Sequence, residues 1–222
     1  AVLAVGEDFF KSGMYDRAED FLKRVGTGKY KAVALRLLID LYVNQNEWHR
    51  AVDVANQLQL ASGQSYASEV AHFMVEISSQ HHCDGDDAKA IDWLRKSLNV
   101  DPQAPRPRLA LGQVLKSQGR YLEAIHELTQ LELESSSFIG LVSDALIECH
   151  DKLGTKNQCL DKFKKLIELS SSHDLLVKTF EMSMELEGQV TACDLARKFL
   201  KTTTDVGWAI PILESIKNDI AE

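Results

Sequence analysis

The chain has 222 residues, of which 45% are hydrophobic, enough to form a continuous core. Its 25 lysines and arginines against 33 aspartates and glutamates give a net charge of −8, which argues against nucleic-acid binding, because that favours clustered basic residues. The most apolar run, AVALRLLIDLYV, includes Arg36 and Asp40 and keeps a helical period, so it predicts a packed helix rather than a membrane span.

The elements expected in chain order are pairs of helices, with small residues returning at matching places. The second helices of the first four pairs are marked by Ala18, Ala51, Ala90 and Ala124. Ala90 and Ala124 are 34 residues apart, which is the period of the tetratricopeptide repeat, an antiparallel helix pair that stacks on copies of itself. Helix backbones approach closely at these places, so replacing Gly112 or Ala124 by leucine is expected to cost a few kcal/mol.

This register predicts an all-α fold, a tetratricopeptide-repeat superhelical solenoid of about six helix pairs plus one terminal helix. The expected repeats occupy residues 1–204 and span 1–28, 32–65, 66–102, 105–136, 138–171 and 174–203. Cys159 marks the fifth pair, and Ala192 or Cys193 the sixth. Residues 205–222 are expected to form the terminal helix, either a cap or half of a truncated pair. Because the chain begins inside a repeat without methionine, we expect it to be part of a longer protein.

The first helix of each repeat faces the concave side of such an array, which makes its polar side chains candidates for partner binding. The candidates are Arg36, Asp40, Asn44, His72, Ser79, His82, Arg106, Gln113, Lys116, Asp144, Glu148 and Asp151, with Lys178 and Glu185 continuing into the sixth repeat. Their order runs from mixed polar through basic to acidic, which favours a partner segment of complementary charge order. The structural alternative, for about half of them, is that they are solvated or bridge neighbouring helices.

For His72 and Asp16, a specific partner-binding role can be weighed against a specific structural role. A histidine at the groove edge can donate and accept hydrogen bonds to a peptide, although a hydrogen bond between helices explains it equally well. His72→Ala, or charge reversal of Arg106 and Lys116, is therefore expected to weaken partner binding without unfolding the array. Asp16 begins a second helix, where a carboxylate can cap exposed amides and oppose the helix dipole; contact with a partner at the turn edge is the alternative.

Catalytic and metal-binding patterns are missing from the sequence. Cys83, Cys149, Cys159 and Cys193 form no Cys-x-x-Cys pair, so we expect them to be reduced, small and buried. The run His81 to Asp84 lies along one helix, where consecutive side chains point apart and cannot converge on a metal ion without distortion. Without a nucleophile elbow, a phosphate-binding loop or HExxH, we expect no enzyme activity, and neither a cofactor nor a metal in this segment.

One known binding mode of the repeat class can be weighed directly. Its chaperone-binding members hold a terminal carboxylate with a lysine at the fifth and an asparagine at the ninth position of one first helix. No first helix here has that combination, which disfavours a co-chaperone of that kind.

Four stretches carry a narrower resemblance: GMYDRAEDFLKRV (13–25), NEWHRAVDVANQL (46–58), EVAHFMVEIS (69–78) and GRYLEAIHEL (119–128). In this order and spacing they resemble the lipopolysaccharide assembly protein B family of Gram-negative bacteria. The residues that the repeat itself does not require are Arg17, Glu19, Asp20, Trp48, Asp53, Ala71 and His72. The likeness covers most of the first 130 residues and is looser afterwards.

The resemblance implies a regulatory scaffold at the cytoplasmic face of the inner membrane. Family members have a membrane anchor, a repeat array and a rubredoxin-like metal module, and they present the lipid A deacetylase to the membrane-bound protease FtsH. The implied partners are these two proteins and other lipopolysaccharide assembly proteins. This segment is expected to be cytoplasmic, without membrane insertion, in a parent anchored to the inner membrane.

Two other functions remain open. The groove alone is also typical of a generic peptide-binding tetratricopeptide adaptor of envelope or secretion machinery. A regulatory array attached to a catalytic domain outside this segment is a third interpretation.

Overall fold

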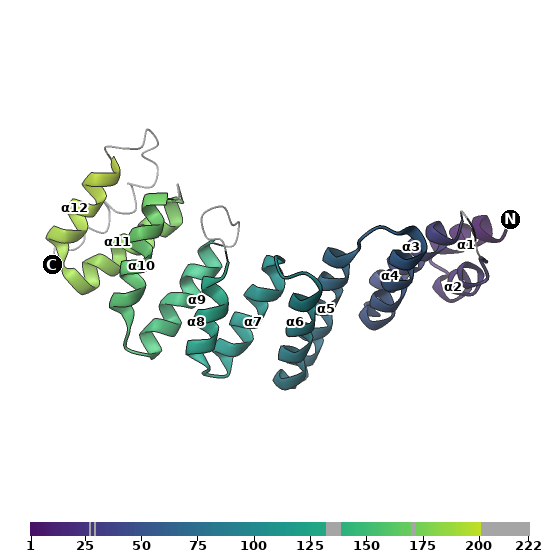
Figure 1. Ribbon diagram of the computed structural model, residues 1–222, viewed down its shortest axis with the longest axis horizontal. Helices are drawn as coiled ribbons and strands as arrows, with labels where there is room; N and C mark the ends of the chain where they lie inside the picture. Colours follow the sequence, from purple (N-terminus) through teal and green to yellow (C-terminus); the bar gives the residue numbers. More distant parts are fainter. Residues whose placement is uncertain (27, 29, 132–138, 170–171, 201–222) are drawn as a thin grey trace. The chain divides into compact units, whose positions relative to one another are not determined.

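The computed structural model describes residues 1–26, 28, 30–131, 139–169 and 172–200, which form twelve helices and no strand (Figure 1). In chain order the helices are α1 (Val2–Lys11), α2 (Tyr15–Lys23), α3 (Lys31–Asn44), α4 (Trp48–Ser62), α5 (Ala67–Cys83), α6 (Asp87–Val100), α7 (Pro105–Ser117), α8 (Tyr121–Thr129), α9 (Ile139–Lys152), α10 (Lys156–Leu169), α11 (His173–Glu187) and α12 (Gln189–Leu200). The terminal helix expected over residues 205–222 lies outside the described residues.

The helices pack in the order in which they occur. A first helix contacts the second helix that follows it in α1 with α2, α3 with α4, α5 with α6, α9 with α10 and α11 with α12. Consecutive pairs then contact each other, as in α2 with α3 and α4 with α5, and the first helices also touch directly, as in α1 with α3. The all-α tetratricopeptide-repeat class predicted from the sequence is confirmed.

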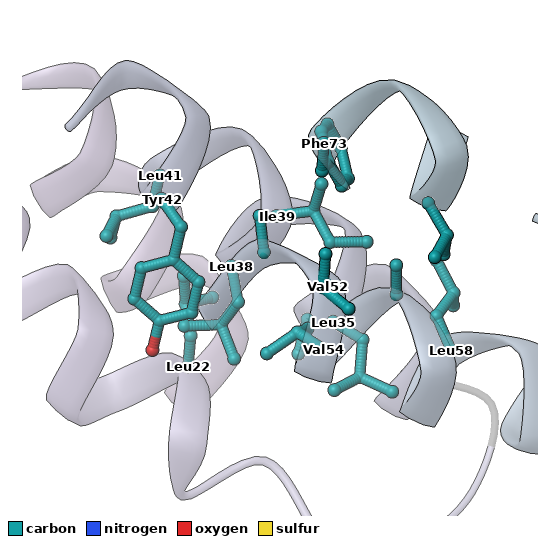
Figure 2. Packing of buried hydrophobic residues seen from close by; sticks show 14 of the residues in the cluster. Leu22, Leu35, Leu38, Ile39, Leu41, Tyr42, Val52, Val54, Leu58 and Phe73 are labelled. Carbon is teal, nitrogen blue, oxygen red and sulfur yellow. The ribbon is translucent and has the colours of Figure 1, made fainter. Parts of the chain in front are cut away.

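The chain divides into two compact units, Ala1–Val114 (unit 1) and Leu115–Glu222 (unit 2), and the division falls within α7. In unit 1, apolar side chains from α2, α3, α4 and α5 form one core cluster. Figure 2 shows Leu22 of α2 beside Tyr42 and Leu38 of α3, with Val52 of α4 and Phe73 of α5 further along. The core therefore runs from one pair into the next, because no single helix pair covers its own apolar side chains.

The turns inside the pairs share one backbone feature. Gly13, Gly85, Gly119 and Gly154 have φ between 66° and 79°, and Asn46 takes the same place with φ 57°. This left-handed conformation costs glycine least and asparagine little, which explains why these two residue types mark the turns.

Small buried residues set the spacing between helices. Ala18, Ala51, Ala90 and Ala124 have no exposed surface, and Cys159 is 1% exposed. In the sixth pair Ala192 takes this place with no exposed surface, whereas Cys193 is half-buried. In α1, a Cβ added to Gly6 would lie 2.9 Å from Leu22 Cδ2, so any side chain there would force Leu22 to shift where α1 and α2 meet.

The cysteines differ from one another in burial. Cys149 and Cys159 are buried as expected, and burial raises the pKa of the Cys159 thiol to about 12. The expectation of burial is wrong for Cys83, which is exposed because it is the last residue of α5, next to the turn.

His150 in α9 is a buried histidine with one unsatisfied nitrogen. Its Nδ1 lies 2.8 Å from Thr155 Oγ1, while Nε2 is buried without a hydrogen-bond partner among the described residues. Burial, with a smaller contribution from Lys162, lowers the pKa of His150, so the folded state favours the neutral ring.

The close contact at the small residues predicts a clear mutational difference within α4. Ala51→Leu should lower the free energy of unfolding by about 1–3 kcal/mol, because the fully buried site has no room for three more carbons. Ala61→Leu, at an exposed position of the same helix, should change it by less than about 0.5 kcal/mol. Urea unfolding followed by circular dichroism measures both; equal effects would contradict the close contact.

Because the pKa of His150 is lowered in the folded state, we expect the protein to lose stability on mild acidification. The contribution of His150 is fully present above the unfolded pKa and is lost as the pH falls through the folded pKa. Between about pH 7.5 and 5.5, the free energy of unfolding of the unmodified protein should therefore fall more than that of His150→Gln, which does not titrate. Urea unfolding at both pH values decides, and parallel losses in the two proteins count against a role for His150.

Candidate functional site

The first-helix face of unit 1 is the polar surface formed by Arg36 and Asp40 of α3, Glu69, His72 and Glu76 of α5, and Arg106 of α7. At one side of it, Arg36 Nη1 donates to both carboxylate oxygens of Glu69, at 2.8 Å each. Both side chains are more than a third exposed, so this pair links α3 to α5 while adding little to stability.

His72 stands at the centre of this face. Its Nδ1 lies 2.9 Å from Arg106 Nη1 and 3.8 Å from Glu76 Oε1. Its ring meets Trp48 of α4 edge-on, with centroids 6.5 Å apart, and lies 5.9 Å from the ring of Phe73. The hydrogen bond between helices, the structural alternative for His72, is therefore present, and it links α5 to α7.

The other predicted residues of unit 1 are spread around these pairs. Asp40 is exposed, yet neighbouring side chains desolvate its carboxyl enough to raise its pKa, an effect that Arg36 partly offsets. Asn44 and Gln113 are exposed amides, one on α3 and one on α7. The Ser79 hydroxyl donates to the carbonyl of Val75 within α5.

His82 turns toward the end of its own helix pair. Its Nδ1 lies 2.5 Å from Asp87 Oδ1 in the first turn of α6. The structure therefore places His82 beside the turn between α5 and α6 and does not join it to His72 or Arg106.

In unit 2 the predicted acidic residues all meet lysines. Glu148 of α9 pairs with Lys116 of α7, and Asp144 Oδ1 lies 2.8 Å from Lys178 Nζ of α11. Asp151 Oδ1 lies 3.0 Å from Lys156 Nζ, which also reaches Glu185. The bridging alternative named for these residues is therefore present at all three acids, since Lys116, Lys178 and Lys156 each lie beside one carboxylate.

Asp16 does not cap its helix. α2 begins at Tyr15 after Met14, which makes no side-chain cap hydrogen bond, so Asp16 lies inside the first turn. There it can still oppose the helix dipole. It is exposed and lines an open depression of ≈ 300 Å³ with Gly13 and Gln45, where contact with a partner stays a prediction.

Sequence reasoning missed the glutamates that complete the face. Glu69 follows Arg36 by 33 residues, and Arg106 follows His72 by 34, so each pair joins equivalent places of adjacent repeats. A search for complementary side chains one repeat apart finds both. Sequence reasoning also missed a second network. In it, Glu19 accepts a hydrogen bond from the Tyr42 hydroxyl and pairs with Arg50, so that side chains from α2, α3 and α4 are linked.

The described residues contain no cluster of three or more histidine, cysteine, aspartate or glutamate side chains that could hold a metal ion. A rubredoxin-like site needs two Cys-x-x-Cys pairs, and the four cysteines of this chain are scattered singly. The residues present do not fit such a module. None of the described helices combines the length and apolar character needed to cross a membrane.

The chain is similar to lipopolysaccharide assembly protein B, as its sequence motifs predict. The protein of Escherichia coli (strain K12) is 26% identical over 175 residues, 78% of this chain and 45% of that protein. The Haemophilus influenzae protein is 28% identical over 161 residues, 72% of this chain and 39% of that protein. The chain thus spans less than half the length of these relatives, and no family model matches it.

Several solved structures of repeat proteins also align with the chain. MamA aligns with a TM-score of 0.46 and 16% identity over 84% of this chain and 93% of that one. A thermophilic tetratricopeptide-repeat protein of Thermus thermophilus aligns with a TM-score of 0.38 and 20% identity over 82% of this chain and 97% of that one. YrrB, described as a repeat protein with an unusual peptide-binding site, aligns with TM-score 0.44 and 13% identity over 78% of this chain and 87% of that one.

The contacts of Lys178 lead us to expect that one ion-pair cluster of unit 2 stabilises the fold. Its side chain is 16% exposed, pairs with Asp144 and Asp174, and donates to the carbonyl of Gly140 and the hydroxyl of Ser143. Lys178→Met should lower the free energy of unfolding by about 1–3 kcal/mol, because it leaves several acceptors without their donor.

The matched control is Lys198→Met in the same unit, where the side chain is 62% exposed and pairs with Glu168. Its effect should stay below about 0.5 kcal/mol. Denaturant unfolding followed by circular dichroism compares the two, and a Lys178 variant as stable as the Lys198 variant rules out the structural role.

Proposed function

We propose that this chain is a non-catalytic protein-binding scaffold that limits lipopolysaccharide synthesis by presenting the lipid A deacetylase to the FtsH protease. The observation that carries the proposal is its similarity, over 78% of its length, to proteins named lipopolysaccharide assembly protein B. In this proposal the scaffold acts at the cytoplasmic face of the inner membrane, because that protease is membrane-bound.

The arrangement of the helices supports a binding role. Side-chain bonds between neighbouring first helices, from Arg36 to Glu69 and from Arg106 to His72, hold polar groups in position before a partner arrives, which lowers the entropic cost of binding. The first-helix face of unit 1 combines arginine, histidine and a neighbouring tryptophan, and tryptophan and arginine are enriched among energetically dominant interface residues.

A scaffold that joins two proteins needs two binding surfaces. Unit 1 has its first-helix face, and unit 2 has its own set of polar first-helix residues, which includes the exposed Asp144 and Glu148 of α9. In our proposal these surfaces bind different proteins, one the deacetylase and the other FtsH.

The alternative is a generic peptide-binding adaptor of envelope or secretion machinery. The first-helix face of unit 1 is compatible with this adaptor, because its residues do not by themselves identify a particular partner. The two functions differ in one consequence, because only the scaffold should accelerate degradation of the deacetylase by FtsH.

The test uses the full-length gene product with purified deacetylase and FtsH. We expect direct binding of the deacetylase by biolayer interferometry, and faster ATP-dependent loss of the deacetylase when the scaffold is added to FtsH. Binding of neither protein contradicts the proposal, and binding of peptides without any effect on degradation favours the adaptor.

Exchanging the two charges of one ion pair tests whether the deacetylase binds the first-helix face of unit 1, without removing that pair. Arg36→Glu combined with Glu69→Arg keeps the pair between α3 and α5 but reverses its polarity. It should weaken deacetylase binding about tenfold while leaving the melting temperature unchanged. The control, Lys89→Ala on the second helix α6, alters a side chain that is 65% exposed and should bind like the unmodified protein.

A further inference from the structure

The contact between His72 and Arg106 determines where the histidine carries its proton. A guanidinium can only donate hydrogen bonds, so at 2.9 Å from Arg106 Nη1 the Nδ1 of His72 must accept. A neutral histidine whose Nδ1 accepts carries its proton on Nε2. Arg106 therefore selects one tautomer of His72.

The direction of the ring is also set. Trp48 meets the ring edge-on at an interplanar angle of 66°, and Phe73 lies against it at 46°. These aromatic contacts from α4 and α5, with the bond from α7, leave the ring one orientation. The Nε2–H then points in one direction from the surface of α5.

That Nε2–H is open to solvent. His72 Nε2 has no hydrogen-bond partner among the described residues, and the buried unpartnered side-chain atom found among them belongs to His150 instead. The His72 side chain is 38% exposed. Both histidines make a hydrogen bond at Nδ1. They differ at Nε2, which is buried in His150 and accessible to a partner in His72.

The surrounding charges decide which acceptor fits. Glu69 and Glu76 lie about one helical turn on either side of His72, so a partner carboxylate would meet two like charges. Each glutamate already has an arginine beside it, Arg36 at 2.8 Å and Arg106 at 3.7 Å, so the site is close to neutral. A neutral oxygen is therefore the best acceptor for this N–H.

We infer that His72 donates its Nε2–H to a main-chain carbonyl in an extended segment of the bound protein, and that Arg106 is the positioning residue that fixes this donor. Extended segments fit because their carbonyls are available, whereas those within a helix or sheet are already paired. The inference rests on the proposed protein-binding function and adds the chemistry of its recognition.

The first experiment tests Arg106 without any partner. In the full-length gene product labelled with ¹⁵N-histidine, long-range ¹H–¹⁵N correlation spectra above the titration range should report the Nε2–H tautomer for His72. Arg106→Met should yield a mixture of tautomers, and Arg106→Lys, which keeps a donor, should restore the single form. An Nδ1–H tautomer in the unmodified protein, or no change in Arg106→Met, overturns the assignment.

The second experiment tests the donor, with purified lipid A deacetylase as the probe. His72→Phe keeps an aromatic ring against Trp48 but removes the N–H, and should weaken binding about tenfold. His72→Gln places an amide N–H near the position of Nε2 and should stay within about threefold of the unmodified protein. Melting curves of both variants separate lost binding from lost folding.

The outcomes separate this inference from the proposed function. Equal affinity of His72→Phe and the unmodified protein overturns the donor role. Equal weakening by His72→Phe and His72→Gln, with unchanged melting curves, overturns it as well, because the donor would then not be what matters. If the unmodified protein does not bind the deacetylase, the proposed function fails, and the tautomer spectra still decide the role of Arg106.

Discussion

Close packing of helices at one small residue in each pair is the constraint on which the rest of this structure depends. Ala51 and Ala124 have no exposed surface, and the same place in the fifth pair is held by Cys159. A larger side chain there would push neighbouring helices apart, and the displacement would pass to the next pair, because each pair forms part of its neighbour's core. The repeat spacing is thus a packing requirement before it is a sequence pattern.

The same spacing creates the polar surface. Because adjacent first helices are held one repeat apart, side chains about 33 residues apart in sequence come into contact, as Arg36 does with Glu69 and Lys116 with Glu148. Within each of these pairs the two charges offset each other. A partner therefore meets hydrogen-bonding groups of defined direction, such as the His72 ring, beside paired charges.

Helices, turns and small buried residues were predictable from the sequence because each depends on local chemistry. Gly119 reports a left-handed turn and Ala124 a close contact, wherever the surrounding chain lies. The partners of surface charges were not predictable in this way, because they depend on which rotamers neighbouring helices allow. The sequence predicts Asp144 as an acidic groove residue without identifying Lys178 as its partner. It also predicts Asp16 as a cap, although the helix begins at Tyr15, after Met14.

Hydrogen–deuterium exchange of the full-length gene product, with and without bound deacetylase, tests the central claim that a protein partner docks on the first helices. The account predicts slower exchange in α3, α5 and the part of α7 that belongs to unit 1, strongest around His72, while α4 and α6 exchange as in the free protein. Protection confined to the second helices, or no protection in unit 1 at all, would contradict it.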